Sequence, residues 1–209
     1  MFKLTHALPD KYYVACSGGV DSMAVLHWSS VKPDRVIAAV YIHHGTGEFA
    51  DKSEQVVREY CVKNNIPLLT YRVEGSCPEG RSKEDWWREQ RYALFQKVPG
   101  TEPIVLAHHL DDCIEEYLMC SLVRGYEGTI AYSNGRCERP FRKWSKGDII
   151  DYAIRHSLTW IEDPSNNNTN FKRNFIRHEI VPRALQLNPG LDKLVKRAID
   201  RIDLNAFEV

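Results

Sequence analysis

The chain has 209 residues, with 28 Lys and Arg against 28 Asp and Glu and a hydrophobic fraction of 43%. This balance is typical of a globular protein and excludes a disordered or collagen-like chain, and a formal net charge of +0 argues at first against a general nucleic-acid binder. Since the sequence shows neither an apolar run of transmembrane length nor the apolar core of a signal peptide, we expect a cytoplasmic protein.

Apolar runs and helix-like stretches alternate along the first two thirds of the chain. Strands are predicted over Tyr12–Cys16, Val36–His43, Leu68–Val73 and Ile104–Ala107. Helices are predicted over Ser22–Ser30, Lys52–Asn64, Lys83–Val98 and Asp112–Val123. This alternation predicts an α/β fold, a Rossmann-like parallel sheet with helices on both faces. In such folds ligands bind at the carboxyl ends of the strands.

The last third is predicted to be mainly helical. A Gly-, Ser- and Asn-rich connecting loop over residues 125–137 precedes helices over Lys146–His156, Phe171–Leu187 and Leu191–Leu204. We therefore expect a nucleotide-binding core over residues 1–135 and a basic, mainly helical extension of the same catalytic unit over residues 136–209. The core carries 14 Lys and Arg against 18 Asp and Glu, whereas residues 136–201 carry 14 against 8. The net charge of +0 therefore results from an acidic core and a basic last third, and the basic last third can bind nucleic acid.

The first predicted strand is followed by the loop Ser17-Gly18-Gly19-Val20-Asp21-Ser22. Two glycines let the backbone approach a ligand, and the free amides at the start of a helix favour an anion such as phosphate. The serines add hydroxyl donors, and Asp21 offers a carboxylate to a metal. The alternative is a structural strand–helix turn in which Asp21 only caps the helix.

Polar clusters also follow two later strands. His43-His44-Gly45 ends the second, and Ala107-His108-His109-Leu110-Asp111-Asp112 follows the fourth and leads into a helix that contains Glu115. Histidines and carboxylates at a strand end can bind Mg²⁺ or act as acid and base. They can equally form structural turns and cap the helix. A zinc site made of the four histidines is a further alternative, although no cysteine spacing supports it.

The six-residue loop resembles the signature of the N-type ATP pyrophosphatases, which split ATP between its α and β phosphates and leave AMP on a substrate oxygen. With the histidine clusters and later segments added, the chain resembles the tRNA(Ile)-lysidine synthetase family. The segments that complete the resemblance are Glu84, Arg88, Arg91 and Tyr92, then Arg139-Pro140, Trp160–Asn166, and Arg173–Arg177 with Pro182. They follow the family order from Tyr12 to about Pro189.

The resemblance implies an adenine nucleotide alpha-hydrolase-like fold and a two-step ligase reaction. ATP first adenylates the C2 oxygen of the wobble cytidine in tRNA(Ile) with a CAU anticodon, and lysine then displaces AMP to give lysidine. The implied ligands are ATP, Mg²⁺, L-lysine and this tRNA; a homodimer is left open.

The resemblance also implies roles for individual residues. The catalytic candidates are Asp21, Arg88, His109, Asp111 and Asp112, and the candidate Mg²⁺ ligands are Asp21 and Asp112. The candidates for binding ATP are Ser17, Gly18, Gly19, Val20, Asp21, Ser22, His43 and His44. The substrate-binding candidates are Glu115, Arg139, Arg173, Asn174 and Arg177. For Arg88, an exposed ion pair with Glu84 is the alternative.

The basic last third is predicted to hold tRNA. Its candidate phosphate contacts are Arg139, Arg142, Lys143, Lys146, Lys172, Arg173, Arg177 and Arg183. Phe141, Trp144 or Phe171 can stack on an unpaired base. The alternatives are solvated surface charges and ordinary core aromatics.

Other functions remain open from the sequence. A tRNA thiolation enzyme would share the ATP loop, but the six cysteines form no Cys-x-x-Cys pair and are expected to be reduced and buried. A non-catalytic nucleotide-binding module, or a ligase that couples another amine, would also keep the glycines. Bacterial members of the family continue into further C-terminal domains. Because this sequence ends at Val209, we expect a short form that lacks those domains. Cys113 stands where the family has Gln.

Overall fold

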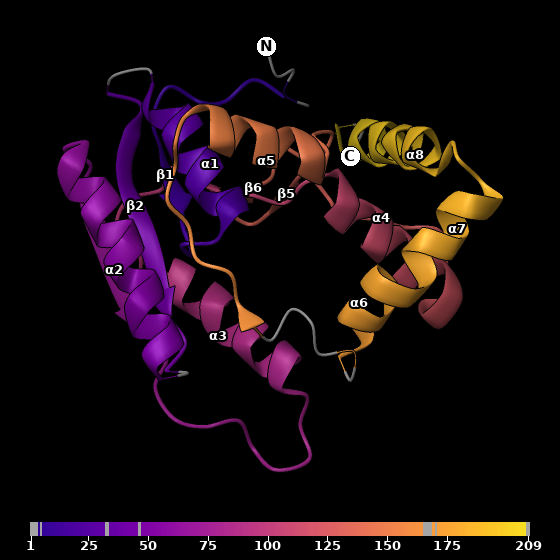
Figure 1. Ribbon diagram of the computed structural model, residues 1–209, viewed down its shortest axis with the longest axis horizontal. Coiled ribbons are helices and arrows are strands. Elements are labelled where there is room, and N and C mark those ends of the chain that lie inside the picture. The colour runs from indigo at the N-terminus through magenta and orange to yellow at the C-terminus, as the bar shows by residue number, and fades with distance from the viewer. Residues whose placement is uncertain are drawn as a thin grey trace.

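The computed structural model describes residues 4, 6–31, 34–45, 47–164, 169 and 171–207, without the side chains of residues 84 and 205–207. Within these residues, a six-stranded sheet of order β3-β2-β1-β4-β6-β5 forms the centre of the fold (Figure 1). The strands are β1 (Tyr12–Ala15), β2 (Val36–His43), β3 (Leu68–Arg72), β4 (Ile104–Val105), β5 (Ser133–Asn134) and β6 (Cys137–Glu138). The pairs β3–β2, β2–β1, β1–β4 and β4–β6 are parallel, which confirms the predicted sheet, and β5 pairs with β6 in antiparallel orientation.

Helices surround this sheet and extend beyond it. They are α1 (Val20–Ser30), α2 (Glu48–Lys63), α3 (Lys83–Phe95), α4 (Leu110–Met119), α5 (Lys146–Arg155), α6 (Lys172–Phe175), α7 (Val181–Leu187) and α8 (Leu191–Phe207). Two π-helical turns, η1 (Cys120–Arg124) and η3 (Ile176–Ile180), continue α4 and join α6 to α7. The helix predicted over residues 171–187 is therefore one run in three segments.

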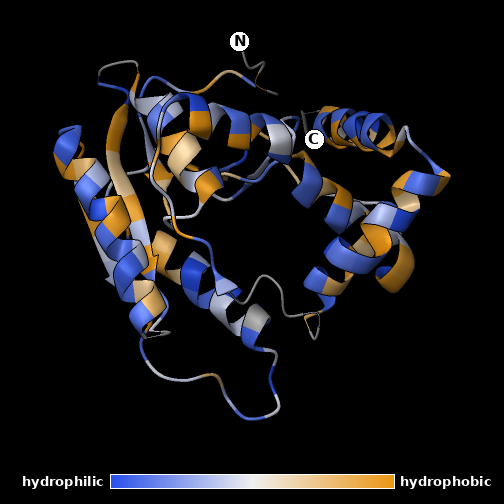
Figure 2. Cartoon of the chain, in the orientation of Figure 1, coloured by the Kyte–Doolittle hydropathy of each residue, from blue (hydrophilic) through white to orange (hydrophobic). Residues whose placement is uncertain are grey.

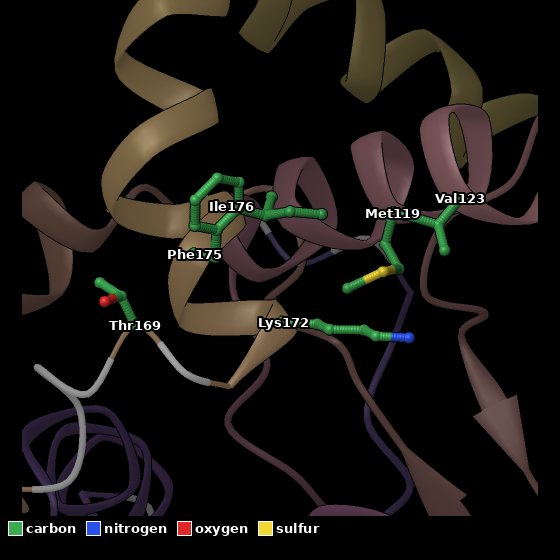
Figure 3. Close-up of a pocket in the computed structure, with 6 residues that line it drawn as sticks. All are labelled: Met119, Val123, Thr169, Lys172, Phe175 and Ile176. Carbon is green, nitrogen blue, oxygen red and sulfur yellow. The ribbon is translucent and has the colours of Figure 1, made fainter.

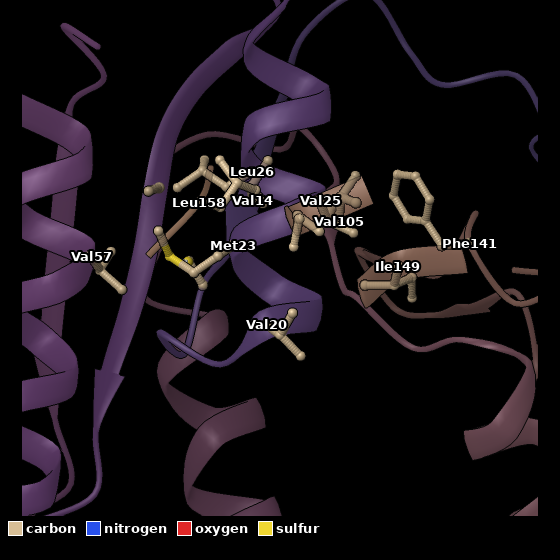
Figure 4. Packing of buried hydrophobic residues seen from close by; sticks show 14 of the residues in the cluster. Val14, Val20, Met23, Val25, Leu26, Val57, Val105, Phe141, Ile149 and Leu158 are labelled. Carbon is tan, nitrogen blue, oxygen red and sulfur yellow. Dashed lines mark hydrogen bonds between the residues drawn. The ribbon is translucent and has the colours of Figure 1, made fainter. Parts of the chain in front are cut away.

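Each face of the sheet has its own core, because successive strand residues point to opposite faces. Tyr12 and Val14 pack with residues of α1, α2 and α5, whereas Tyr13 packs with residues of α3. Figure 4 shows the first of these clusters, with Val14 of β1 beside Leu26 of α1. β2 is hydrophobic along most of its length (Figure 2), which is expected for a strand buried on both faces.

A third apolar cluster lies beside the sheet and contains residues of α4, η3 and α8. Ile114 and Leu118 of α4 pack there against Val195 and Ile199 of α8. In Figure 1 the helices α6, α7 and α8 gather on the opposite side of the molecule from α2. Since α4 begins directly after β4, it connects the end of the sheet to these last helices.

The hairpin β5–β6 lies within the stretch that was predicted to be a loop. Each of its strands has two residues, too few for a periodic pattern. β6 pairs with β4, and Ile149 of α5 belongs to the same cluster as β1. The division into two units at residue 135 stays a prediction, and the apolar core around β1 contains residues from both units.

Several aromatic and basic residues predicted to face tRNA are buried instead. Phe141 is 0% exposed and Trp144 is 3% exposed, so both are core residues and the prediction that they stack on a base is wrong. Arg142 is also 0% exposed, and its Nη2 lies 2.5 Å from Asp203 Oδ2 on α8. Its remaining donors bind the carbonyl oxygens of Arg139 and Ile130. Arg142 is therefore not a phosphate contact, because the C-terminal helix supplies its partner.

No helix in the described part of the chain is long and apolar enough to cross a membrane. The cysteines are free thiols: Cys16, Cys61, Cys113, Cys120 and Cys137 are buried, and Cys77 is partly exposed.

Candidate functional site

The loop after β1 has a conformation that requires glycine at its second position. Gly18 has a φ of +82°, and a Cβ there would lie 2.5 Å from Ser53 Oγ of α2. The Ser17 N–H donates to Ser22 Oγ at 3.0 Å, and the Ser22 hydroxyl donates to the Gly19 carbonyl at 2.9 Å. These bonds close the loop, and the first amides of α1 have no partner inside the helix.

The N-termini of three helices meet beside this loop. Asp21 of α1 is bound by Lys146 of α5, whose Nζ lies 2.6 and 2.7 Å from the two carboxylate oxygens. His109, the N-cap of α4, has its Nε2 3.6 Å from Asp21 Oδ1 and 3.4 Å from Asp112 Oδ2. The Lys146 N–H donates to Asp111 Oδ2 at 3.3 Å. The structure thus brings four of the predicted catalytic and ATP-binding residues together with one lysine.

The charges in this group support one another. Burial opposes ionisation of Asp21, but the hydrogen bond and charge of His109 and the charge of Lys146 outweigh it and lower the pKa of Asp21. Burial also disfavours the charged form of His109, yet Asp112 and Asp21 raise its pKa above the ordinary value. For Asp112, burial is outweighed by His109 and Arg173, so its pKa is well below the usual range.

Glu115 is held by two arginines from the segment α6–η3. It is 3% exposed; Arg173 Nε lies 2.9 Å from one carboxylate oxygen and Arg177 Nε lies 2.6 Å from the other. Arg173 Nη2 also lies 3.3 Å from Asp112 Oδ1. Three predicted substrate-binding residues therefore do come together, but they bind one another. Asn174 lies beside Arg173 on α6.

Two hollows flank α4. A charged one of about 230 Å³ is lined by Asp85, Arg88, Glu115, Glu116, Met119, Arg124 and Arg173, from α3, α4, η1 and α6. A mainly apolar one of about 390 Å³ lies against the far end of α4, where Figure 3 shows Met119, Val123, Phe175 and Ile176 with Lys172 at one side. Arg88 thus lines a cavity, and its guanidinium carbon also lies 5.3 Å from the ring centre of Tyr92.

Residues 3–184 match a family model described as a PP-loop domain. The chain belongs to the PP-loop domain family. We call the segment Ser17–Ser22, which joins β1 to α1, the PP-loop, and membership of the family supports the use of ATP.

The similar curated proteins support the resemblance that the motifs indicated. A bifunctional protein TilS/HprT from Listeria monocytogenes is 37% identical over 200 residues, 87% of this chain and 31% of that protein. The tRNA(Ile)-lysidine synthases of Exiguobacterium sibiricum and Escherichia coli O157:H7 are 31% and 34% identical, over 92% and 88% of this chain and 48% and 46% of theirs. The chain spans about half the length of these relatives or less.

Two solved structures share the PP-loop fold. A U34-tRNA thiolase NcsA from Methanococcus maripaludis superposes with a TM-score of 0.73 at 13% identity, over 93% of this chain and 72% of that one. An NH3-dependent NAD synthetase from Campylobacter jejuni gives 0.55 at 15% identity, over 93% and 86%. At such identities the likeness shows the fold alone.

Two predicted site residues, one a candidate for binding ATP and one for binding substrate, have structural roles. His43 is 1% exposed, with Nε2 2.9 Å from Asp51 Oδ1 and Nδ1 accepting the Gly45 N–H at 3.0 Å, so both ring nitrogens are engaged. Arg139 is buried, and it donates to the Ala131 carbonyl and the Tyr92 hydroxyl. In this conformation the ring of His43 has no nitrogen left for a ligand, and the side chain of Arg139 is buried and binds within the fold.

Two further histidines of the strand ends, His44 and His108, have a ring nitrogen that the described fold leaves open. Both Nδ1 atoms are buried, and neither has a hydrogen-bond partner among the described residues. Burial, with the charge of Arg91, lowers the pKa of His44 to about 4. Burial, with nearby arginines outweighing Asp112, lowers that of His108 to about 3. Both imidazoles are therefore neutral at pH 7 and can donate to or accept from a ligand.

The sequence did not predict the roles of Lys146 and of the segment after α5 at this site. Lys146 was predicted to contact tRNA, and the segment 158–164 crosses the PP-loop, where the Ile161 N–H donates to the Gly18 carbonyl at 3.0 Å. A lysine in the first turn of a helix is unfavourable for the helix dipole, which is a signal that it has another partner. Ser165 and Asn166, predicted as part of a family segment, lie outside the described residues.

Proposed function

We propose that this chain carries the catalytic domain of a cytoplasmic ligase that converts the wobble cytidine of tRNA(Ile) with a CAU anticodon to lysidine, using ATP and L-lysine. The observation that carries the proposal is the meeting of two strand ends. The PP-loop residue Asp21 and the α4 residue His109 lie 3.6 Å apart beside an anion-binding loop. The relatives named tRNA(Ile)-lysidine synthases supply the reaction. Residues 1–135 would bind ATP, and residues 136–209 would complete the site.

The PP-loop fits the phosphates of ATP. Gly18 leaves space where any side chain would meet Ser53, and the amides at the start of α1 point out of the helix. The hydroxyl of Ser17 lies 3.2 Å from Ser22 Oγ and donates to it, so it would have to turn to donate to a phosphate. We expect Val20 and Ser22 to contribute chiefly through their backbone amides, because Val20 is apolar and the Ser22 hydroxyl donates to Gly19.

The two candidate metal ligands differ in their fit to Mg²⁺. Asp112 is surrounded by cationic donors from Arg173 and Arg177 and by the His109 N–H, so its surroundings do not fit a metal. Asp21 is partly exposed at the mouth of the loop and fits a metal once Lys146 leaves its oxygens. Bound Mg²⁺ would offset negative charge on the departing pyrophosphate.

The neighbouring residues then have distinct tasks in the proposed reaction. Nε2 of His109 faces carboxylate oxygens of Asp21 and Asp112, which orients its N–H as a donor beside the PP-loop. Among the described residues, Asp111 accepts one hydrogen bond, from the backbone N–H of Lys146. Its remaining lone pairs make it the better candidate to accept a proton from the attacking amine.

The charged hollow beside α4 is suited to an amino acid. Within the described side chains, its Glu115, Glu116, Arg124 and Arg173 are engaged in ion pairs, whereas Asp85 and Arg88 are not. Asp85 and Arg88 lie three residues apart on α3, so they share one face of the helix. A carboxylate and a guanidinium at this spacing would hold the α-ammonium and α-carboxylate of lysine.

Contacts to tRNA are proposed for the exposed residues of α6. Phe175 is 48% exposed and lies with Lys172 at the apolar hollow (Figure 3). An exposed aromatic ring beside a cation can stack on an unpaired base and bind its phosphate. Phe175 therefore replaces Phe141 and Trp144 as the best aromatic candidate.

The test is incorporation of labelled lysine into an isoleucine tRNA with a CAU anticodon, in the presence of ATP and Mg²⁺. We expect lysine-dependent AMP release and labelled tRNA. The same tRNA with U at the wobble position should stay unlabelled. Asp21→Ala should abolish both products while the protein stays folded. A well-folded sample that adds no lysine to either tRNA would refute the proposed reaction.

A further inference from the structure

The ion pair between Lys146 and Asp21 contributes little to the stability of the fold. Lys146 is the first residue of α5, where its charge meets the positive end of the helix dipole. The side chains are 35% and 29% exposed, and ion pairs with such exposure contribute little to stability. The position of this lysine therefore calls for an explanation in terms of a ligand.

Asp21 has an unfavourable position for a phosphate site. It is the second residue of α1, so its carboxylate competes with an incoming anion for the positive helix terminus and repels it. His109 Nε2 is 3.6 Å away, whereas Lys146 Nζ is bonded to both oxygens. Lys146 is thus the closest neutralising charge for Asp21.

The backbone of Lys146 is fixed, while its side chain is partly exposed. Ser145 caps α5 in a capping box with Asp148, and the Lys146 N–H is bound to Asp111. An ammonium group has three N–H donors, of which two face Asp21, so one remains for a phosphate oxygen. When a divalent cation takes the carboxylate, all three donors are available to the phosphates.

We propose that Lys146 is an exchangeable counter-cation of the phosphate site. Without a divalent metal it neutralises Asp21 and contacts a bound polyphosphate; when a metal binds Asp21, it turns fully to the polyphosphate. The proposal rests on the proposed function, because it requires ATP or pyrophosphate at the PP-loop. It makes Lys146 a competitor of the metal for Asp21 as well as a ligand for the anion.

The test is calorimetric titration of pyrophosphate into the whole chain, first with EDTA and then over a series of Mg²⁺ concentrations. The variants are Lys146→Ala, Lys146→Gln and Lys146→Arg. The matched control is Lys143→Ala, which removes the same charge three residues earlier from a surface pair with Asp200. Thermal melting verifies that each variant is folded, and the Gln variant serves if the Ala variant is not.

Two results are expected. With EDTA, Lys146→Ala should weaken pyrophosphate binding about tenfold or more, as expected for the loss of one charge-assisted hydrogen bond, while Lys146→Arg and Lys143→Ala change it less than about threefold. In the Mg²⁺ series, Lys146→Ala should lower the concentration that gives half of the metal effect by about threefold or more, because the carboxylate no longer has to release a lysine.

Each other result has a definite meaning. Wild-type protein that binds pyrophosphate neither with nor without metal would contradict the proposed function itself. Wild-type protein that binds it only with Mg²⁺, or a Lys146→Ala variant that binds like wild type in EDTA, would overturn the role of Lys146 and leave the proposed function standing. An unchanged or raised Mg²⁺ midpoint in the same variant would overturn the exchange.

Discussion

Removing the carboxylate of Asp203 should destabilise the whole protein, although this residue of α8 has no part in the proposed reaction. Asp203 is the charged partner of Arg142, at 2.5 Å, and the guanidinium of Arg142 is fully buried. In Asp203→Ala the two backbone carbonyls bound to Arg142 and the ring of Tyr132 remain, but the positive charge loses its carboxylate. Leaving a buried charge unpaired costs about 3–5 kcal/mol. For a chain of this size, that loss corresponds to a fall in melting temperature of roughly 6–20 °C.

The assay is urea and thermal unfolding of Asp203→Ala beside the control Asp200→Ala. Asp200 is three residues earlier on α8 and forms an exposed pair with Lys143, so its loss should cost less than about 1 kcal/mol. The double variant Arg142→Met with Asp203→Leu should recover most of the stability, because it leaves no charge in the interior. A loss below about 1 kcal/mol for Asp203→Ala would refute the reasoning, since water would then be reaching Arg142.

Three further predictions concern the site. Glu115→Gln should lower the free energy of unfolding by about 2–4 kcal/mol, because it leaves two arginines without their carboxylate. Glu116→Gln, in a more exposed pair, should lower it by less than about 1 kcal/mol. Urea unfolding measures both variants, and equal losses would contradict the special role of the two arginines that bind Glu115. The pKa of His108 is lowered to about 3, so between pH 6.5 and 4 only the unfolded state binds the extra proton, and the free energy of unfolding decreases as the pH falls. His108→Asn should reduce the slope of the free energy of unfolding against pH by up to about 1.4 kcal/mol per pH unit. An unchanged slope would show that His108 is not buried as a neutral group. Gly18→Ala should abolish ATP binding in a calorimetric titration. It should also lower the free energy of unfolding more than Gly75→Ala does, because Gly75 has the same φ of +82° but no atom within 4 Å of the added carbon. Equal losses of stability would show that Ser53 moves aside for the added carbon in the PP-loop.

Much of the sheet could be predicted because its strands are buried on both faces. β2 was predicted over its observed bounds, since eight consecutive residues of Val36–His43 are apolar or follow an apolar run. Parallel strands place their carboxyl ends at one edge of the sheet, which explains why the residues that follow β1 and β4, Asp21 and His109, lie together. The hairpin β5–β6 could not be predicted, because its strands are defined by pairing with the sheet rather than by their own sequence.

The charged residues were harder to predict, because their exposure depends on partners that are distant in sequence. Arg142 lies in a basic stretch that is typical of a surface, and only Asp203, 61 residues later, makes its burial favourable. Glu115 was predicted to bind substrate, while two arginines 58 and 62 residues later occupy its oxygens. The residue types of the site could thus be read from the sequence, but the pairing among them required the tertiary fold.

The π-helical turns η1 and η3 have a consequence for comparing this chain with its relatives. A π turn holds one residue more than the α-helical turn it replaces. Deleting one residue from η3 would therefore restore a regular helix and leave the residues after it on nearly the same faces, because the π turn and the α turn each complete one revolution. Ile180, Val181 and Ala184, which pack against the cluster around α4 and α8, would still face that cluster. A relative with one residue fewer at this point should therefore keep the apolar pattern of α7, so the gap in an alignment belongs in η3.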